Sequence, residues 1–265
     1  MEISKLSKLI TPSGTMAISN KARVLREQGK PVIGFGAGES DFPTPEYVIK
    51  DVQAAAEDTS NHKYSPVAGL TILKEEIVRT SELYSGINVK QENVLVSNGG
   101  KHAILTTFMS ILNPGDEVLI PSPYWTTYPE AVKISGGNPV IVDTEFDDDF
   151  KINTEQLDSL KTSKTKVLVW VSPSNPTGSV YSKEELSGLA DVLKRHRQVV
   201  VLSDEIYEHI NFVGKHESIA QFEAIKERVI IVNGLSKKIL AGTIDKTKPV
   251  LVDVFDGVVV FRNEA

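Results

Sequence analysis

Two acidic residues, Asp204 and Glu205, follow an apolar run at residues 199–202, with only Ser203 between. Such a run is typical of a strand buried on both faces, so an acid at its end would be partly desolvated. A buried carboxylate needs a cationic partner, and a protonated pyridine nitrogen is one such partner. A solvated helix cap explains the same residues, and taken alone they favour that second interpretation.

A lysine that could act as a nucleophile follows a second apolar run, at residues 229–232. It is Lys237, in the stretch Asn233-Gly234-Leu235-Ser236-Lys237-Lys238. A lysine at such a place is usually a surface charge. In a crevice near other cations it loses its proton and can form an imine with a carbonyl compound.

Three further clusters have residue types that suit a ligand. Ser97-Asn98-Gly99-Gly100-Lys101 would present backbone N–H groups at a helix start, which suits a phosphate, although a plain glycine turn fits equally. Pro121-Ser122-Pro123-Tyr124-Trp125 has a tryptophan that either packs in the core or stacks on a flat ring. Ser172-Pro173-Ser174-Asn175-Pro176-Thr177-Gly178 is a polar turn, but its two prolines hold Asn175 rigidly.

The elements that must position these clusters alternate between strands and helices. Apolar runs buried on both faces predict an α/β fold, a three-layer, mostly parallel sheet with helices on both faces. Ligands bind such sheets outside the carboxyl ends of the strands, where the clusters lie. Strands are expected at residues 31–35, 93–97, 117–120, 138–142, 167–171, 199–203 and 228–232, and helices at 15–28, 46–57, around 70–77, and at 101–112, 126–134, 154–160 and 183–196.

The composition excludes several classes of function. The chain has 265 residues, a net charge of -6 and no cysteine, which excludes disulfides, thiolate nucleophiles and cysteine-bound metals. The negative charge argues against nucleic acid as the main partner. With no apolar run long enough for a bilayer and no secretory signal, we expect no membrane partner and a cytoplasmic location.

The clusters, in this order, resemble the class I (fold-type I) pyridoxal-phosphate (PLP)-dependent aminotransferases, in particular bacterial aspartate aminotransferases. Single motifs of this kind are weak, but seven in register are specific. The matching stretches are residues 36–42, 63–69, 97–101, 121–125, 172–178, 203–207 and 233–237.

The resemblance implies a role for each residue around the cofactor ring. Lys237 would form the Schiff base with PLP and later move the substrate's α-proton. Asp204 would keep the pyridinium nitrogen protonated, and Tyr207 and Asn175 would hydrogen-bond the phenolic oxygen. Trp125 would stack on the ring. The catalytic residues would therefore be Lys237, Asp204 and Tyr207, and no metal is expected.

The resemblance also implies residues at the phosphate and at the substrate. Gly99, Gly100 and Lys101 would lie at the phosphate end, and Tyr64 would reach the phosphate of the neighbouring subunit of a homodimer. Lys101 would face the distal carboxylate of a dicarboxylic substrate, which favours aspartate or glutamate, with prephenate as a further acceptor. The implied substrate-binding set is Gly38, Lys101, Trp125 and Asn175.

The similarity ends abruptly after Lys238. The arginines that bind the cofactor phosphate and the substrate α-carboxylate in the family have no counterpart, and Arg262 is the only arginine after that point. We expect an N-terminal segment at 1–45, a PLP-binding large domain at 46–238 and a divergent tail at 239–265, with the small domain largely missing. In the tail, 250–255 and 258–261 flank Asp256-Gly257 and predict a β-hairpin; the tail is either a natural end or a frameshift product.

Three hypotheses follow for the function. The first is an aminotransferase that moves an amino group from aspartate, or a similar amino acid, to a 2-oxo acid by ping-pong Schiff-base chemistry. The second is a PLP-binding or dimerising fragment without turnover, because the α-carboxylate arginine is absent. The third is a truncated product with no stable fold. The residues favour membership of the family over activity of this particular chain.

Overall fold

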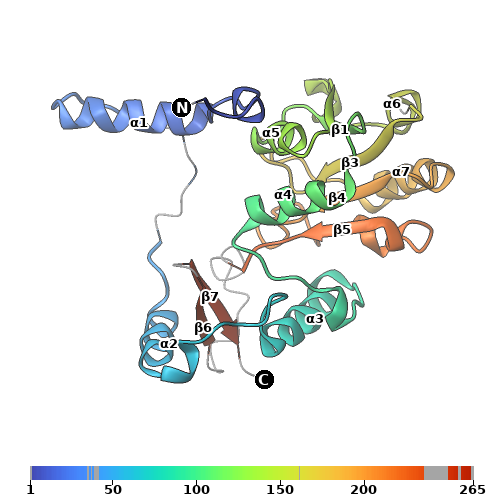
Figure 1. Ribbon diagram of the computed structural model, residues 1–265. Coiled ribbons are helices and arrows are strands. Elements are labelled where there is room, and N and C mark those ends of the chain that lie inside the picture. Colours follow the sequence, from blue (N-terminus) through green and yellow to red (C-terminus); the bar gives the residue numbers. More distant parts are fainter. Residues whose placement is uncertain are drawn as a thin grey trace.

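The computed structural model describes residues 2–34, 36, 38, 42–160, 162–235, 250–255 and 258–263. Its main body is a five-stranded parallel sheet in the order β2-β1-β3-β4-β5 (Figure 1). This architecture confirms the fold class expected from the apolar runs. The strands are β1 (Glu117–Pro121), β2 (Asn138–Val142), β3 (Thr165–Val171), β4 (Val200–Asp204) and β5 (Val229–Val232).

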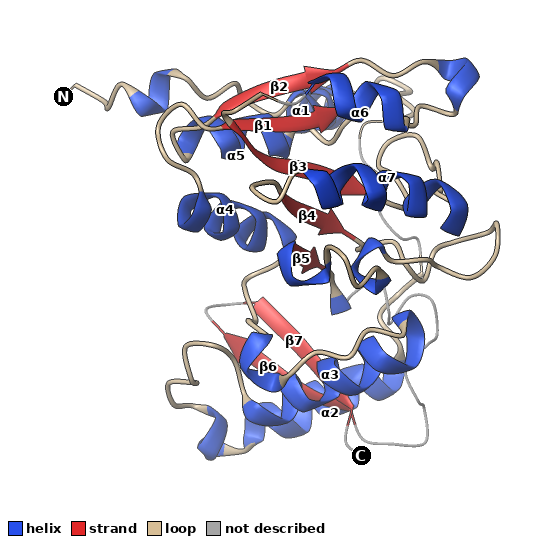
Figure 2. Ribbon diagram, turned by 90° about the vertical axis from the view of Figure 1, so that its right-hand side faces the viewer, coloured by secondary structure: helices blue, strands red, loops and turns tan. Residues whose placement is uncertain are grey.

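Helices cover both faces of this sheet (Figure 2). The helices α4 (Gly100–Ile111) and α5 (Thr127–Ile134) pack on one face, and α6 (Thr154–Leu160) and α7 (Lys183–Arg195) pack on the other. The pleat of the strands divides the core accordingly, because successive side chains point to opposite faces. Val167 and Val169 of β3 belong to the cluster under α4 and α5.

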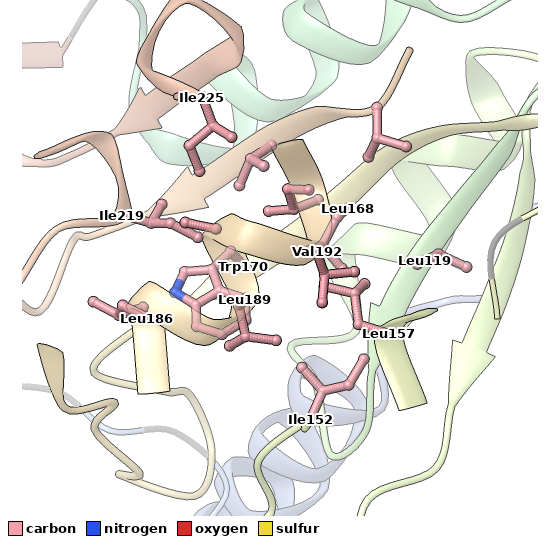
Figure 3. Packing of buried hydrophobic residues seen from close by; sticks show 14 of the residues in the cluster. Leu119, Ile152, Leu157, Leu168, Trp170, Leu186, Leu189, Val192, Ile219 and Ile225 are labelled. Atoms are coloured by element: carbon pink, nitrogen blue, oxygen red, sulfur yellow. The ribbon is translucent and has the colours of Figure 1, made fainter. Parts of the chain in front are cut away.

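The other face of β3 carries the second core cluster. Leu168 and Trp170 pack there against Leu186 and Leu189 of α7, and all four side chains are almost completely buried (Figure 3). Both faces of the central strands are therefore filled with aliphatic and aromatic groups. This is why the sequence of β3 reads as one continuous apolar run and not as an alternating pattern.

Helices α1 (Gly14–Glu27), α2 (Glu46–Glu57) and α3 (Thr71–Ser85) lie outside this three-layer body (Figure 1). The strands β6 (Val250–Phe255) and β7 (Val258–Asn263) pair antiparallel in the ranges where the sequence pattern placed a hairpin, and they lie beside α2 and α3. The division of the chain at residues 45 and 238 stays a prediction. The short 3₁₀ turns are Leu6–Lys8, Thr59–Asn61, Gln91–Asn93, Phe146–Asp148, Ile219–Gln221 and Lys226–Arg228.

Two of the predicted strands are wrong. Residues 31–34 form no strand: Pro31 has no N–H to donate and Ile33 is 82% exposed. Residues 94–97 also form no strand, although Val96 donates one backbone hydrogen bond to the carbonyl of Ala68. An apolar run becomes a strand only where a neighbour can pair with it, and neither segment is paired with a strand among the described residues.

Helix α7 has a complete capping box at its start. The Ser182 hydroxyl accepts a hydrogen bond from the backbone N–H of Glu185, and the Glu185 carboxylate accepts one from the N–H of Ser182. We expect Ser182→Ala to lower the free energy of unfolding by about 1 kcal/mol, because one helical N–H loses its partner. Chemical denaturation would measure this loss. Ser159→Ala on the exposed side of α6 is the control; an equal loss in both variants would contradict the capping role.

Candidate active site

Four polar segments meet at the carboxyl edge of the sheet. They follow β1, β3, β4 and β5, and each of these strands was predicted to end in a ligand-facing cluster. The chain passes from β1 to its neighbour β2 on one side and then crosses to β3 on the other side. The strand order thus reverses between β1 and β3, and parallel sheets bind ligands in the crevice at such a reversal.

Asp204 is the buried acid at this edge, with only 4% of its surface exposed. Its Oδ2 accepts a hydrogen bond of 2.7 Å from the Tyr128 hydroxyl, and its Oδ1 accepts one of 3.2 Å from the backbone N–H of Ile206. Burial raises the pKa of Asp204, and these two hydrogen bonds oppose the rise. No described lysine, arginine or histidine forms an ion pair with Asp204, so a cationic ligand atom would complete its environment.

The pleat of β4 separates Asp204 from its neighbour Glu205. Asp204 has the same parity as Leu202, whose side chain packs under α4 and α5, and this parity turns it toward Tyr128 of α5. Glu205 instead accepts hydrogen bonds from Ser218 and His216. Only one of the two adjacent acids is therefore directed toward the α4 and α5 side, where Lys101 and Trp125 also lie.

Tyr207 and Asn175 come from segments that follow different strands, and their side chains are hydrogen-bonded to each other. Burial raises the pKa of the Tyr207 hydroxyl, the charge of Asp204 adds to the rise, and the hydrogen bond from Asn175 opposes it. The structure thus brings Tyr207, Asn175 and Asp204 together, as the sequence predicted. An amide and a phenol so arranged can donate to one anionic oxygen of a ligand.

Trp125 and Lys101 lie on the β1 side of the same edge. The Lys101 ammonium is 5.5 Å from the centre of the Trp125 ring, and that ring meets the Tyr128 ring edge-on at 5.6 Å. Tyr128 therefore links this aromatic group to Asp204. An open groove of ≈ 460 Å³ adjoins Lys101 and is also lined by Tyr124 and Thr11.

Gly99 is the N-cap of helix α4, and Gly100 is its first residue. The φ angle of Gly99 is +82°, a conformation that other residues rarely adopt, and a side chain at Gly100 would come within 3.9 Å of Ile206. The first N–H groups of a helix have no partner within it, so this turn offers donors beside a positive helix end. These features suit a phosphate group.

Two predicted residues, Tyr64 and Gly38, are not brought into this group, and a third lies outside the described residues. The Tyr64 side chain is fully exposed in the loop after the second 3₁₀ turn, and Gly38 is exposed with no atom near the position of a side chain. Lys237 lies outside the described residues. The sequence analysis also missed Tyr128, whose only signal was its place three residues after Trp125, in the first turn of α5.

Comparisons with known proteins show which proteins this chain is similar to. The family described as aminotransferase class I and II matches residues 30–242. An aspartate aminotransferase of Bacillus subtilis (strain 168) is 45% identical over 239 residues, which cover 89% of this chain and 60% of that protein. An aspartate/prephenate aminotransferase of Nitrosomonas europaea is 39% identical with the same coverage of both chains. This chain thus spans about three fifths of these curated relatives.

Solved structures give the same result. The aspartate aminotransferase from Thermus thermophilus with maleate superimposes with a TM-score of 0.86 at 38% identity, over 92% of this chain and 63% of that one. The enzyme from Rhizobium meliloti has a TM-score of 0.86 at 34% identity, over 91% and 60%. No helix within the described ranges is long and apolar enough to cross a membrane.

Proposed function

Since this chain belongs to the class I and II aminotransferases, we propose that its carboxyl-edge crevice binds pyridoxal 5'-phosphate and that Lys237 is the lysine attached to it. One observation carries the proposal: Asp204 is buried without a described cationic partner and is hydrogen-bonded by Tyr128. A pyridinium nitrogen is a cation of the right kind for such a carboxylate.

The other residues fit the remaining parts of this cofactor. Tyr207 and Asn175 would hold its phenolic oxygen, and Trp125 would cover its ring. The glycine turn at the start of α4 would hold its phosphate together with Lys101. When bound, the cofactor supplies a ring that withdraws electrons from the substrate's α-carbon.

We further propose that the substrates are an amino acid and a 2-oxo acid. Several relatives are named aspartate aminotransferases, and the Lys101 ammonium beside the open groove suits the distal carboxylate of aspartate. The proposed enzyme would transfer the amino group in two half-reactions as a homodimer in the cytoplasm. Gly38 and Tyr64 would complete the sites from the segments that precede the sheet.

The test is to locate the lysine that carries the cofactor. The chain is mixed with pyridoxal phosphate, reduced with borohydride and digested, and mass spectrometry identifies the modified lysines. We expect one stoichiometric adduct on Lys237, which Lys237→Ala removes and Lys238→Ala, its matched neighbour, retains. Adducts scattered over surface lysines, or no adduct, would refute the proposal.

A second candidate function is cofactor binding without turnover. It is favoured by residues 239–265, in which Arg262 is the single arginine. Aspartate and 2-oxoglutarate separate the two candidates once Lys237 is labelled. Glutamate formation supports the transaminase, whereas a cofactor absorbance that aspartate does not shift supports the binding fragment.

A further inference from the structure

A third buried acid after Asp204 and Glu205, Glu208, lies one residue after Tyr207 and has no part in the proposed chemistry. Only 6% of its surface is exposed. Its backbone N–H donates to the carbonyl of Glu205, which keeps Glu208 in the tight turn that also carries Tyr207. An acid buried this deeply is retained only where several donors compensate the loss of water.

The carboxylate of Glu208 joins three separate elements. Its Oε2 accepts a hydrogen bond of 2.6 Å from the hydroxyl of Ser85, the last residue of α3. Its Oε1 accepts one of 2.6 Å from the side-chain amide of Asn233, the residue after β5. His209 Nε2 lies 3.2 Å from the same Oε1. Glu208 therefore ties the Tyr207 turn to the end of β5 on one side and to α3 on the other.

Glu208, Glu205 and His216 approach one another closely enough to suggest a cation site. The Glu205 carboxylate is already bound by Ser203, Ser218 and His216. All four carboxylate oxygens thus accept hydrogen bonds from side chains of the protein. The two carboxylates are therefore satisfied by the protein itself, although His216 Nδ1 is buried with no hydrogen-bond partner among the described residues, and they join several chain segments.

Of the residues that contact Glu208, Asn233 is the nearest in sequence to Lys237. It lies four residues before Lys237 in the sequence, at the point where the chain leaves the sheet. Its Oδ1 accepts a hydrogen bond of 2.8 Å from the N–H of Gly234, so the Asn233 side chain fixes both the strand end and the next residue. Just before it, the Val232 carbonyl accepts a hydrogen bond from the N–H of Glu205.

We propose that Glu208 is a positioning residue for the cofactor lysine. Through Asn233 it would hold the start of the segment leading to Lys237 in a fixed place relative to the turn that carries Asp204 and Tyr207. The proposal rests on the proposed function, because it concerns the attachment of pyridoxal phosphate to Lys237. The Ser85 contact would have a different role, which is to hold α3 against the turn that carries Glu208.

The test compares Asn233→Ala with Ser85→Ala, since each removes one 2.6 Å donor from the same carboxylate. Hydrogen bonds to charged groups are strong enough that we expect Asn233→Ala to weaken pyridoxal phosphate binding at least about tenfold. Borohydride labelling of Lys237 should fall in parallel at limiting cofactor. Ser85 is 3% exposed, so Ser85→Ala should lower the melting temperature more and leave cofactor affinity near the wild-type value.

A double variant that exchanges the donor and the acceptor tests whether the Glu208–Asn233 contact can be restored. In the double variant Glu208→Gln with Asn233→Asp, the new glutamine amide can donate to the new aspartate, while its carbonyl oxygen still accepts from Ser85. We expect the double variant to recover cofactor affinity that Asn233→Ala loses. If the effect were only structural, the loss of cofactor affinity would instead parallel the loss of melting temperature in all variants.

The outcomes are distinguishable. Wild-type affinity in Asn233→Ala, equal losses in Asn233→Ala and Ser85→Ala, or no recovery in the double variant would overturn the positioning role while leaving the proposed function intact. A wild-type chain that carries no adduct on Lys237 would overturn both. Loss of affinity in Asn233→Ala alone, followed by recovery, would support the proposal.

Discussion

Asp204→Asn is expected to slow the reaction of the cofactor-loaded chain with aspartate by roughly 10²–10⁴-fold, since breaking a buried ionic contact costs about 3–5 kcal/mol. The variant keeps the shape of the side chain and can still bond Tyr128 and the N–H of Ile206. It lacks the negative charge that would keep a pyridine nitrogen protonated. Single-turnover absorbance changes after addition of aspartate would measure the effect.

Without cofactor, the same variant should be more stable than the wild type at neutral pH. Because burial raises the pKa of Asp204, the folded chain binds this proton more tightly than the unfolded chain does. The resulting stabilisation is complete below the unfolded pKa of about 3.9 and is lost as the pH rises through the higher folded value. At neutral pH, Asp204→Asn should therefore melt at a higher temperature than wild type, and the difference should disappear in acid.

Two controls make this expectation specific. Asp191→Asn removes an exposed charge from α7 and should change the melting temperature little at any pH. Addition of pyridoxal phosphate should stabilise the wild type more than Asp204→Asn, because only the wild type has a negative charge that would face the pyridine nitrogen. A variant that melts below wild type at neutral pH without cofactor would refute the view that Asp204 is held charged at a cost to stability.

Glu205→Ala is expected to lower the free energy of unfolding by about 3–5 kcal/mol, which is the range for breaking a buried ionic group. Glu205 is 2% exposed, and it accepts hydrogen bonds of 2.8 Å from Ser203, 2.6 Å from Ser218 and 2.9 Å from His216. Truncation leaves these three polar groups buried without their acceptor, in addition to a cavity.

The comparison with Glu205→Gln separates the two causes. Glutamine fills the same space and the two serine hydroxyls can rotate to meet it, so its loss should be smaller than that of alanine. Glu223→Ala, which removes an exposed partner of Lys226, should cost less than about 1 kcal/mol. Urea denaturation of the three variants gives the order, and a Glu205→Ala loss no larger than that of Glu223→Ala would show that the network contributes nothing.

Local patterns predicted the elements of the sheet and its helices because their apolar periods are long and regular. The helix at Thr154–Leu160 and the strand at Asn138–Val142 have the predicted ends. Residues 31–34 and 94–97 failed because pairing depends on what lies alongside in space, which a local window does not contain. Whether a strand forms at these two segments depends on which segments lie beside them in the folded chain.

The sequence predicts those residues of the candidate site that lie directly at the ends of strands. Asp204, Tyr207 and Asn175 follow apolar runs, and parallel strands bring such ends to one edge. The contacts of Tyr128 with Asp204 and of Ser85 with Glu208 join residues 76 and 123 positions apart. No local pattern encodes these contacts, so the residues that support the site were missed. The placement of Lys237 rests on the resemblance alone.

Because side chains alternate between the two faces along β4, the neighbouring acids Asp204 and Glu205 have unrelated roles. Asp204 is turned toward Tyr128, and Glu205 is turned toward His216. A deletion of one residue inside β4 would exchange these directions and place the longer acid where the shorter one belongs. Within β4 the site can therefore change only by substitution and not by a change of length.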